Sequence, residues 1–186
     1  MTATNCSSFA FEISPLLCRS GVIGMACCPG TLLATGAITD QSLRLDMDIA
    51  TIMEWGASTV VTLVESRELN WLRVQNLPNV IQEAGLDWIH LPIQDGMAPN
   101  AEFDKNWRKV GPRLLAQLDT GENILLHCVA GYGRTGTVAA KLLIASGLNA
   151  QNAIERVRKT RPGTIENRIQ EDYLFAVTKT GRLKRE

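Results

Sequence analysis

Apolar residues along the chain fall into two patterns, short continuous runs and longer segments in which they recur every three or four positions. The first 35 residues hold three short β-like runs, "FAFEI", "GVIGMA" and "TLLAT", which Gly, Pro and Cys separate. Such punctuation is typical of small antiparallel strands at the edge of a sheet. Later apolar runs predict three buried strands, "STVVTLVE", "DWIHLPI" and "NILLH".

The longer segments predict helices between and after these buried strands. In the first of them Leu45, Ile49, Ile52 and Met53 share one face, and Gly56 can end the helix. The predicted helices cover residues 40–56, 77–85, 101–121, 134–147, 149–163 and 164–181. Strand and helix alternate through the middle of the chain, which favours parallel strands with helical crossovers. We therefore predict an α/β fold, a three-layer sandwich whose central, mostly parallel sheet has helices on both faces.

Length and composition favour one globular domain. The chain has 186 residues, so we predict a single domain over 1–186, with a β-rich segment at about 8–35 and a basic tail at about 179–186. With 45% hydrophobic and 20% charged residues, the chain can bury a sizeable core. Nineteen acidic side chains balance nineteen basic ones, so no overall basic field favours nucleic acid, and we expect no such partner.

The cysteines indicate the compartment. There are five, an odd number at irregular spacing, which fits neither a disulfide framework nor a zinc site and favours a reducing environment. The first residues, "MTATNCSSFAFE", lack the basic and apolar regions of a signal peptide. The longest loosely apolar stretch is broken by Pro29 and several glycines, so we expect no membrane partner. We expect a cytoplasmic protein, and the oligomeric state stays open.

Two polar segments follow the buried strands at positions where α/β sheets bind ligands. The segment "QDGMAP" comes after the second buried strand, and "CVAGYGR" comes after the third. Ligand sites in such sheets lie beyond the carboxyl ends of the strands. We therefore expect these two segments to form one site.

The second segment, within "HCVAGYGRTG", has the features of an anion-binding loop. Five residues separate Cys128 from Arg134, and the glycines among them allow backbone N–H groups to curl around a tetrahedral oxyanion. A helix starting near Arg134 adds its positive end, and the guanidinium can contact two phosphoryl oxygens. The residues expected to bind the substrate here are Val129, Ala130, Gly131, Tyr132, Gly133 and Arg134.

Cys128 is the candidate nucleophile of this loop. A cysteine at the end of a strand is more often a small buried packing residue, but the glycines and Arg134 in register favour catalysis. The positive field at the helix start stabilises a thiolate, and Thr135 can donate its hydroxyl to the sulfur. His127 sits on the strand beside the nucleophile, so we expect it to orient the loop rather than act as a base.

Asp95 is the candidate general acid. It lies in "PIQDGMAP", between Pro92 and Pro99, and Gly96 gives the segment mobility. Its carboxyl group can protonate a leaving alkoxide or phenoxide and then activate water against the phosphocysteine. Asp-Gly is also a common turn, which is the simpler reading of this residue. Because backbone dipoles and Arg134 neutralise the phosphoryl charge, we expect neither a metal nor a cofactor.

These segments resemble a known family. "HCVAGYGRTG" resembles the His-Cys-x5-Arg-Ser/Thr signature of cysteine-dependent protein phosphatases, and "PIQDGMAP" resembles their general-acid loop. "TRPGTIENRIQEDYLF" is similar to the segment after the signature in small dual-specificity phosphatases, which implies that Gln170 helps place the hydrolytic water. "GVIGMACCPGT" and "HLPIQDGMAPN" are similar to the kinase-associated phosphatase subgroup, also called cyclin-dependent kinase inhibitor 3.

The resemblance implies a hydrolase of phosphotyrosine and phosphoserine or phosphothreonine, with a phosphoprotein partner and, in that subgroup, a cyclin-dependent kinase substrate. Phosphoinositide phosphatases of the superfamily usually carry lysines where this chain has Val129 and Tyr132, which argues against an inositol head group. The alternatives are a phosphatase of a non-protein substrate, such as an RNA 5′-phosphate or a phosphoinositide, and a phosphate-binding module without turnover. A rhodanese or an arsenate reductase also uses a loop cysteine, but this loop length and the partnered Asp95 favour a phosphatase.

Overall fold

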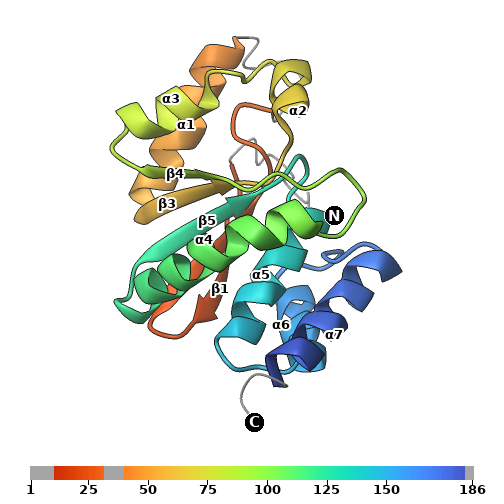
Figure 1. Ribbon diagram of the computed structural model, residues 1–186. Coiled ribbons are helices and arrows are strands. Elements are labelled where there is room, and N and C mark those ends of the chain that lie inside the picture. Colours follow the sequence, from red (N-terminus) through yellow and green to blue (C-terminus); the bar gives the residue numbers. More distant parts are fainter. Residues whose placement is uncertain (1–10, 32–39, 183–186) are drawn as a thin grey trace, which may run out of the picture.

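A computed structural model of the protein describes residues 11–31 and 40–182 (Figure 1). Its centre is a sheet of five strands in the order β1-β2-β5-β3-β4. Strand β1 pairs antiparallel with β2, and the other three pairings are parallel. The strands are β1 (Ser14–Cys18), β2 (Gly21–Ala26), β3 (Ala57–Thr62), β4 (Asp87–His90) and β5 (Asn123–His127).

Helices cover both faces of this sheet. Helices α1 (Gln41–Glu54), α2 (Ser66–Trp71) and α3 (Leu77–Glu83) lie above it in Figure 1. Helices α4 (Ala101–Asp119), α5 (Gly133–Ala145) and α6 (Ala150–Thr160) lie below, and α7 (Arg168–Arg182) packs on α5 and α6. The predicted α/β class and three-layer architecture are confirmed. No helix within 11–31 and 40–182 has both the length and the apolar character needed to cross a membrane.

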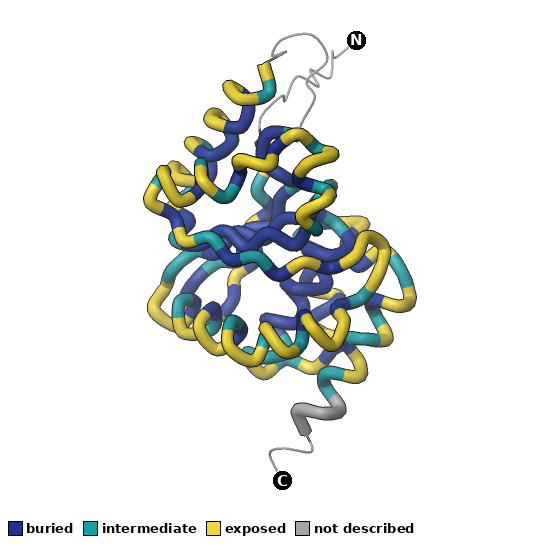
Figure 2. Tube along the Cα trace, turned by 45° about the horizontal axis from the view of Figure 1, so that its top comes forward, coloured by how far each residue is buried: buried dark blue, intermediate teal, exposed yellow. Residues whose placement is uncertain are grey.

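The core lies between the sheet and its two helical layers, as the buried central strands of Figure 2 show. The middle of β5 is apolar without alternation, and Ile124, Leu125 and Leu126 are all fully buried. A strand covered by helices on both faces requires this composition. The continuous apolar runs in the sequence are therefore explained by the two-sided packing.

The predictions for the N-terminal strands were partly wrong. The run "FAFEI" is not the first strand, because residues 11–13 have no regular structure and β1 begins at Ser14. Pairing with β2 sets these bounds, from Ser14 opposite Met25 to Cys18 opposite Gly21. Strand β2 is an inner strand rather than an edge strand, since it also pairs with β5. Residues 9–10 and most of "TLLAT" lie outside the described residues.

Two helices also differ from the prediction. Helix α2 was missed because it has six residues and buries only Leu69. Helix α7 begins at Arg168 rather than at residue 164, because the Asn167 side chain caps it by accepting the backbone N–H of Gln170 at 3.0 Å. It then continues to Arg182, into the stretch predicted as a basic tail.

Candidate active site

The site lies at the carboxyl ends of β3, β4 and β5. Parallel pairing brings these ends into line, with Thr62 opposite both His90 and His127. The loops that leave the three strands therefore start side by side, at the right-hand end of the sheet in Figure 1. The sheet thus joins the loop at residues 128–134 and the loop at residues 94–100, as predicted from their places in the sequence.

The 128–134 loop is tightly packed around Cys128. The side chain of this residue is buried, with 4% of the residue exposed, and its Sγ accepts the N–H of Gly131 at 3.3 Å. Gly131 has φ 79°, and a Cβ there would lie 2.4 Å from the carbonyl oxygen of Ala26. The N–H of Cys28 donates to the carbonyl of Val129 at 2.9 Å. Only glycine fits at position 131, and the end of β2 holds the loop in its curled shape.

His127 fixes the loop from below through a buried chain of hydrogen bonds. Trp88 Nε1 donates to Thr62 Oγ1 at 2.9 Å, and this hydroxyl lies 2.8 Å from His127 Nε2. His127 Nδ1 lies 3.3 Å from the carbonyl oxygen of Cys128. Because the Cys128 carbonyl can only accept, Nδ1 carries the proton and donates to it, and Nε2 of the neutral ring accepts from the Thr62 hydroxyl. Burial lowers the pKa of His127 to about 4, so the ring is neutral at pH 7.

Arg134 is buried in the first turn of α5 and is held by carboxylates. Its Nη1 and Nη2 donate to the two carboxylate oxygens of Glu68 at 2.6 and 2.9 Å, and Nη1 also donates to the carbonyl of Ile93 at 3.0 Å. Burial raises the pKa of Glu68, but hydrogen bonds from Arg134 and from the N–H of Glu65 outweigh it and hold this pKa below its usual range. The ion pair therefore persists at neutral pH and fixes the guanidinium plane.

Asp95 lies at the mouth of the site and is 78% exposed by its side chain. Its Oδ1 is 2.9 Å from Nη2 of Arg134, which brings the two predicted catalytic residues together across 39 positions of sequence. Asn167 Nδ2, at the start of α7, donates to the carbonyl of Gly96 at 2.9 Å. The 94–100 loop is thus held over the 128–134 loop by these two polar contacts.

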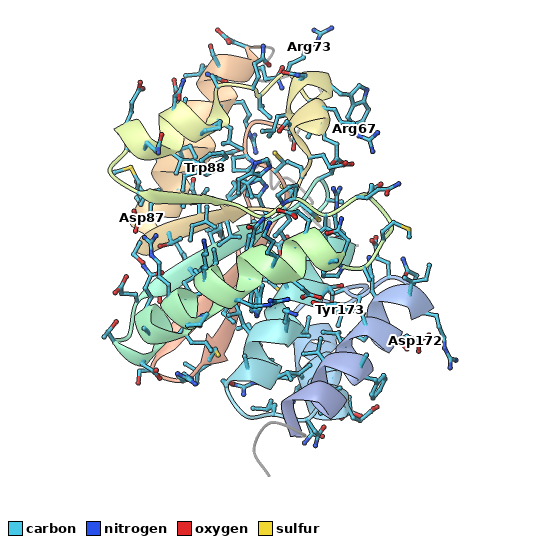
Figure 3. All side chains as sticks on the ribbon, in the orientation of Figure 1. Arg67, Arg73, Asp87, Trp88, Asp172 and Tyr173 are labelled. Carbon is cyan, nitrogen blue, oxygen red and sulfur yellow. The ribbon has the colours of Figure 1, made fainter. Side chains whose placement is uncertain are left out.

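After the 94–100 loop, a partly buried polar cluster anchors the start of α4. Lys141 Nζ donates to Asp104 Oδ1 at 2.9 Å, and Tyr173 donates to the same oxygen at 2.6 Å. Burial lowers the pKa of Lys141 against the effect of Asp104, and burial raises that of Tyr173. Figure 3 shows Tyr173 between α4, α5 and α7. This cluster ties the helix that follows the 94–100 loop to the helix that follows the 128–134 loop.

Arg161 supports the 128–134 loop from its outer side. Its guanidinium lies 4.6 Å from the ring centroid of Tyr132, and Nη2 donates to the carbonyl of Ala130 at 3.4 Å. Nη1 donates to Ser14 Oγ at 2.9 Å, which ties the same side chain to β1. Arg161 therefore braces the middle of the loop, where no regular structure supports the backbone.

Four buried donors on residues in or beside the loop have no hydrogen-bond partner among the described residues. They are Arg134 Nε, Thr135 Oγ1, Arg161 Nε and Gln170 Nε2. Gln170 belongs to α7, yet a Cβ on Gly133 would lie 2.9 Å from its Nε2, so its amide touches the loop. Buried polar groups in folded proteins are almost always paired. A cluster of unpaired donors beside curled backbone N–H groups is the donor set of an anion site.

The predicted site residues are therefore brought together, with one contact missing. Arg134 pairs with Asp95, and the Gln170 amide lies against Gly133 in the loop that follows Cys128, but the Thr135 hydroxyl makes no hydrogen bond to the Cys128 sulfur. Sequence reasoning missed Glu68. The Glu65 N–H donates to Glu68 Oε2 at 2.7 Å, in the capping-box spacing "ESRE", and that spacing after a buried strand was the available signal.

Asn167 and the bracing role of Arg161 were also missed, because no local pattern links either residue to loops so far away in sequence. No group of three or more His, Cys, Asp or Glu side chains suited to a metal ion occurs in the part of the chain that the structure describes. The Arg134–Asp95 ion pair joins the loop that follows the cysteine to the loop that carries the carboxyl group. That combination suits displacement at phosphorus with protonation of the leaving oxygen.

Comparisons with known proteins agree with this chemistry. A family model described as "Polymorphic toxin system, DSP-PTPase phosphatase" matches residues 35–148. Protein tyrosine phosphatase type IVA 3 of Mus musculus is 30% identical over 77% of this chain and 78% of its own length. Cyclin-dependent kinase inhibitor 3 of Rattus norvegicus is 28% identical over 94% of this chain and 74% of its own.

The fold has a solved counterpart. The crystal structure of a kinase associated phosphatase, with its catalytic cysteine replaced by serine, superposes with a TM-score of 0.78 at 24% identity. The superposition covers 94% of this chain and 97% of the other. The five-stranded sheet and its helical layers are therefore the architecture of that phosphatase.

Proposed function

The chain belongs to the DSP-PTPase family of phosphatases, and on this premise we propose that it hydrolyses phosphotyrosine and phosphoserine or phosphothreonine in proteins through a phosphocysteine intermediate. Members of this family are phosphoric monoester hydrolases, which agrees with the cysteine, arginine and carboxylate around one loop. The observation that carries the proposal is that several buried donors on residues in or beside the Cys128 loop have no hydrogen-bond partner among the described residues.

The residues of the site divide the reaction into two displacements. In the first, Cys128 Sγ forms a bond to phosphorus as the ester oxygen leaves with a proton from Asp95. In the second, the Asp95 carboxylate takes a proton from water as the water oxygen attacks phosphorus and the S–P bond breaks. Inorganic phosphate leaves and the cysteine sulfur is restored. The loop N–H groups and Arg134 bind the equatorial oxygens in both steps, and the Gln170 amide positions the water.

The uncharged loop supports a phosphoprotein substrate. Val129 and Tyr132 offer no cation to the further phosphates of an inositol head group. Tyr132 is also covered on one side by the Arg161 guanidinium at 4.6 Å, which already donates to Ser14.

A protein kinase of the cyclin-dependent class is the finer form of this proposal, and it rests on the similarity to proteins named cyclin-dependent kinase inhibitor 3. Turnover requires Cys128 in its reduced form. We therefore propose that the protein acts in a reducing compartment, the cytoplasm.

The test compares phosphate release from a small aryl phosphate with and without the nucleophile. Cys128→Ser is expected to lower kcat by at least about a thousandfold in buffer containing a chelator, since the serine hydroxyl is a far weaker nucleophile in this setting. Leu17→Ala, an exposed change on the far edge strand, is the control and should retain full activity. Full activity in Cys128→Ser, or turnover that depends on added metal, would contradict the mechanism.

A substrate panel then tests the substrate class. It compares phosphotyrosine and phosphothreonine peptides, phosphoinositide vesicles and RNA carrying a 5′-triphosphate. We expect the highest kcat/KM on the phosphopeptides. Faster release from the lipid or the RNA would reject the protein substrate while keeping the chemistry of Cys128, and tight phosphate binding without release from any substrate would indicate a binding module.

A further inference from the structure

A pocket of about 310 Å³ opens beside the 128–134 loop, lined by Glu65, Arg67, Glu68, Trp71 and Asp95. Glu68 and Asp95 are the carboxylates that bind Arg134, so the pocket shares a wall with the phosphate site. Figure 3 shows Arg67 pointing outward from α2 at this end of the molecule. A residue whose phosphate reaches Cys128 therefore brings its neighbours in sequence to this pocket.

Trp71 gives the pocket an exposed aromatic wall. It is the last residue of α2 and is 75% exposed, more than any other large apolar side chain in the described ranges. Single exposed apolar residues are common, but an indole beside a reaction centre offers a ligand a broad flat face. The face of an indole attracts a cation held within about 6 Å of its centre. Trp71 is therefore suited to an aliphatic side chain that ends in a positive charge.

The charges around the pocket select the same kind of ligand. Three carboxylates line it, from Glu65, Glu68 and Asp95, against two guanidinium groups: Arg67 in the lining and the buried Arg134, which pairs with Glu68 and Asp95. Arg67 is engaged as well, because its Nη2 and Nε donate to Glu65 Oε2 at 2.7 and 3.1 Å, so one negative charge remains in excess. A phosphate bound in the neighbouring loop adds further negative charge. An acidic side chain would be repelled here, whereas a basic one would be attracted.

Building on the proposed phosphoprotein function, we propose that this pocket binds an arginine or lysine side chain located close in sequence to the phosphorylated residue of the substrate. The cationic group lies on the Trp71 ring and pairs with the Glu65 carboxylate. Trp71 and Glu65 are then determinants of specificity, outside the group of residues that carry out the chemistry.

The experiment measures kcat/KM on phosphopeptides in which one neighbouring position at a time is Arg, Ala or Glu. At one or two positions we expect kcat/KM to be about fivefold or more higher with Arg than with Ala, because the Arg side chain adds an exposed cation–π contact and an exposed ion pair. Glu at the same positions should fall below Ala. Equal rates for all three residues, or a preference for Glu, would overturn the proposal.

Variants assign the preference to the pocket. Trp71→Ala and Glu65→Gln should each reduce the ratio of kcat/KM on the Arg peptide to kcat/KM on the Ala peptide to under about twofold. The control is Leu17→Ala, which removes an exposed apolar side chain at the opposite edge of the sheet and should keep the wild-type ratio. Arg67→Ala should raise the ratio, because it frees the Glu65 carboxylate. Equal losses on the Arg and Ala peptides in Trp71→Ala would indicate a structural role and overturn the proposal, as would a lower ratio in Arg67→Ala.

These outcomes are distinct from failure of the proposed function. If the phosphopeptides are hydrolysed well but without any preference for a basic neighbour, only the pocket assignment fails. If phosphopeptides of every kind are poorer substrates than the lipid or RNA of the panel above, the protein substrate itself is rejected and this inference is rejected with it.

Discussion

The two loops of the site are built in opposite ways. The 128–134 loop is buried, continuous in sequence and braced from three sides, by the end of β2, by His127 and by Arg161. The 94–100 loop is exposed at Asp95 and is held over the site by an ion pair to Arg134 and a hydrogen bond from Asn167. The nucleophile and the oxyanion donors are thus pre-organised, whereas the acid rests on contacts that can open and close.

Replacing the general acid Asp95 is expected to give the largest effect that distinguishes the roles of the two loops. Asp95→Asn is expected to lower kcat on a phosphothreonine peptide by about several hundredfold, since the alkoxide then leaves without a proton. On an aryl phosphate with an activated leaving group the loss should stay below about tenfold. Paired kcat measurements on the two substrates check this. An equal loss on both would show that Asp95 is structural and that another group supplies the proton.

Removing the negative charge of Glu68 tests how much the 128–134 loop depends on the ion pair that fixes Arg134. Glu68→Gln keeps the shape of the side chain but removes the charge that fixes the guanidinium, and we expect kcat/KM to fall by about a hundredfold, the scale of a misplaced binding group. The loss should be equal on aryl phosphate and phosphopeptide. Asp87→Asn, which breaks the exposed pair with Arg113, is the matched control and should change the rate by less than about twofold. Similar effects from both variants would contradict the role assigned to Glu68.

The pH dependence of stability tests the support beneath the 128–134 loop. His127 has a pKa of about 4 in the folded protein and near 6.5 when unfolded, because burial disfavours its charged form. Above pH 6.5 His127 is neutral in both the folded and the unfolded chain, so it does not change the free energy of unfolding. As the pH falls from 6.5 to 4, the unfolded chain binds the proton before the folded protein does, and this lowers the free energy of unfolding. We expect this group alone to remove about 2 kcal/mol of the free energy of unfolding between pH 7 and pH 5.

Urea unfolding at pH 7 and pH 5 measures this loss in the wild type and in His127→Asn. The variant should be less stable at pH 7, but it should lose less stability between the two pH values, because the depressed group is gone. A drop of equal size in both proteins would show that other groups carry the pH dependence.

The smallest effect is expected at the contact that holds the 94–100 loop. Asn167→Asp keeps an acceptor for the N–H of Gln170 but removes the donor to the Gly96 carbonyl. We expect kcat on the phosphothreonine peptide to fall by about fivefold, the effect of one hydrogen bond. Asn106→Asp, on the exposed face of α4, is the control. A loss confined to KM would mean that Asn167 contacts the substrate rather than the loop.

Much of the reactive loop was predictable because its residues are contiguous. The interval from Cys128 to Arg134, the glycine at 131 and the helix that follows predict a curled backbone, and the close approach of Ala26 at the end of β2 explains why residue 131 is glycine. The strand runs were also predictable from the sequence, since the middle of β5 is buried on both faces and carries three consecutive apolar residues. By contrast, α2 buries only Leu69, so no periodic pattern marked it.

The partners of the site were the part that sequence patterns did not supply. Glu68 meets Arg134 across 66 positions, and Asn167 meets Gly96 across 71, distances over which no local spacing rule applies. Thr135 shows the reverse case, a local expectation that the tertiary arrangement did not bear out, because its hydroxyl is buried without the predicted bond to sulfur.

The sequence by itself determined the chemical groups of this phosphatase, the residue spacing of its anion loop and the alternation of strands and helices, because these depend on residues near each other in the chain. The tertiary structure alone decided which carboxylates hold Arg134, how the 94–100 loop is tied to α7 and where a pocket opens beside Trp71. The physical reason is that parallel strands line up their carboxyl ends, and this alignment, rather than spacing in sequence, sets which side chains meet.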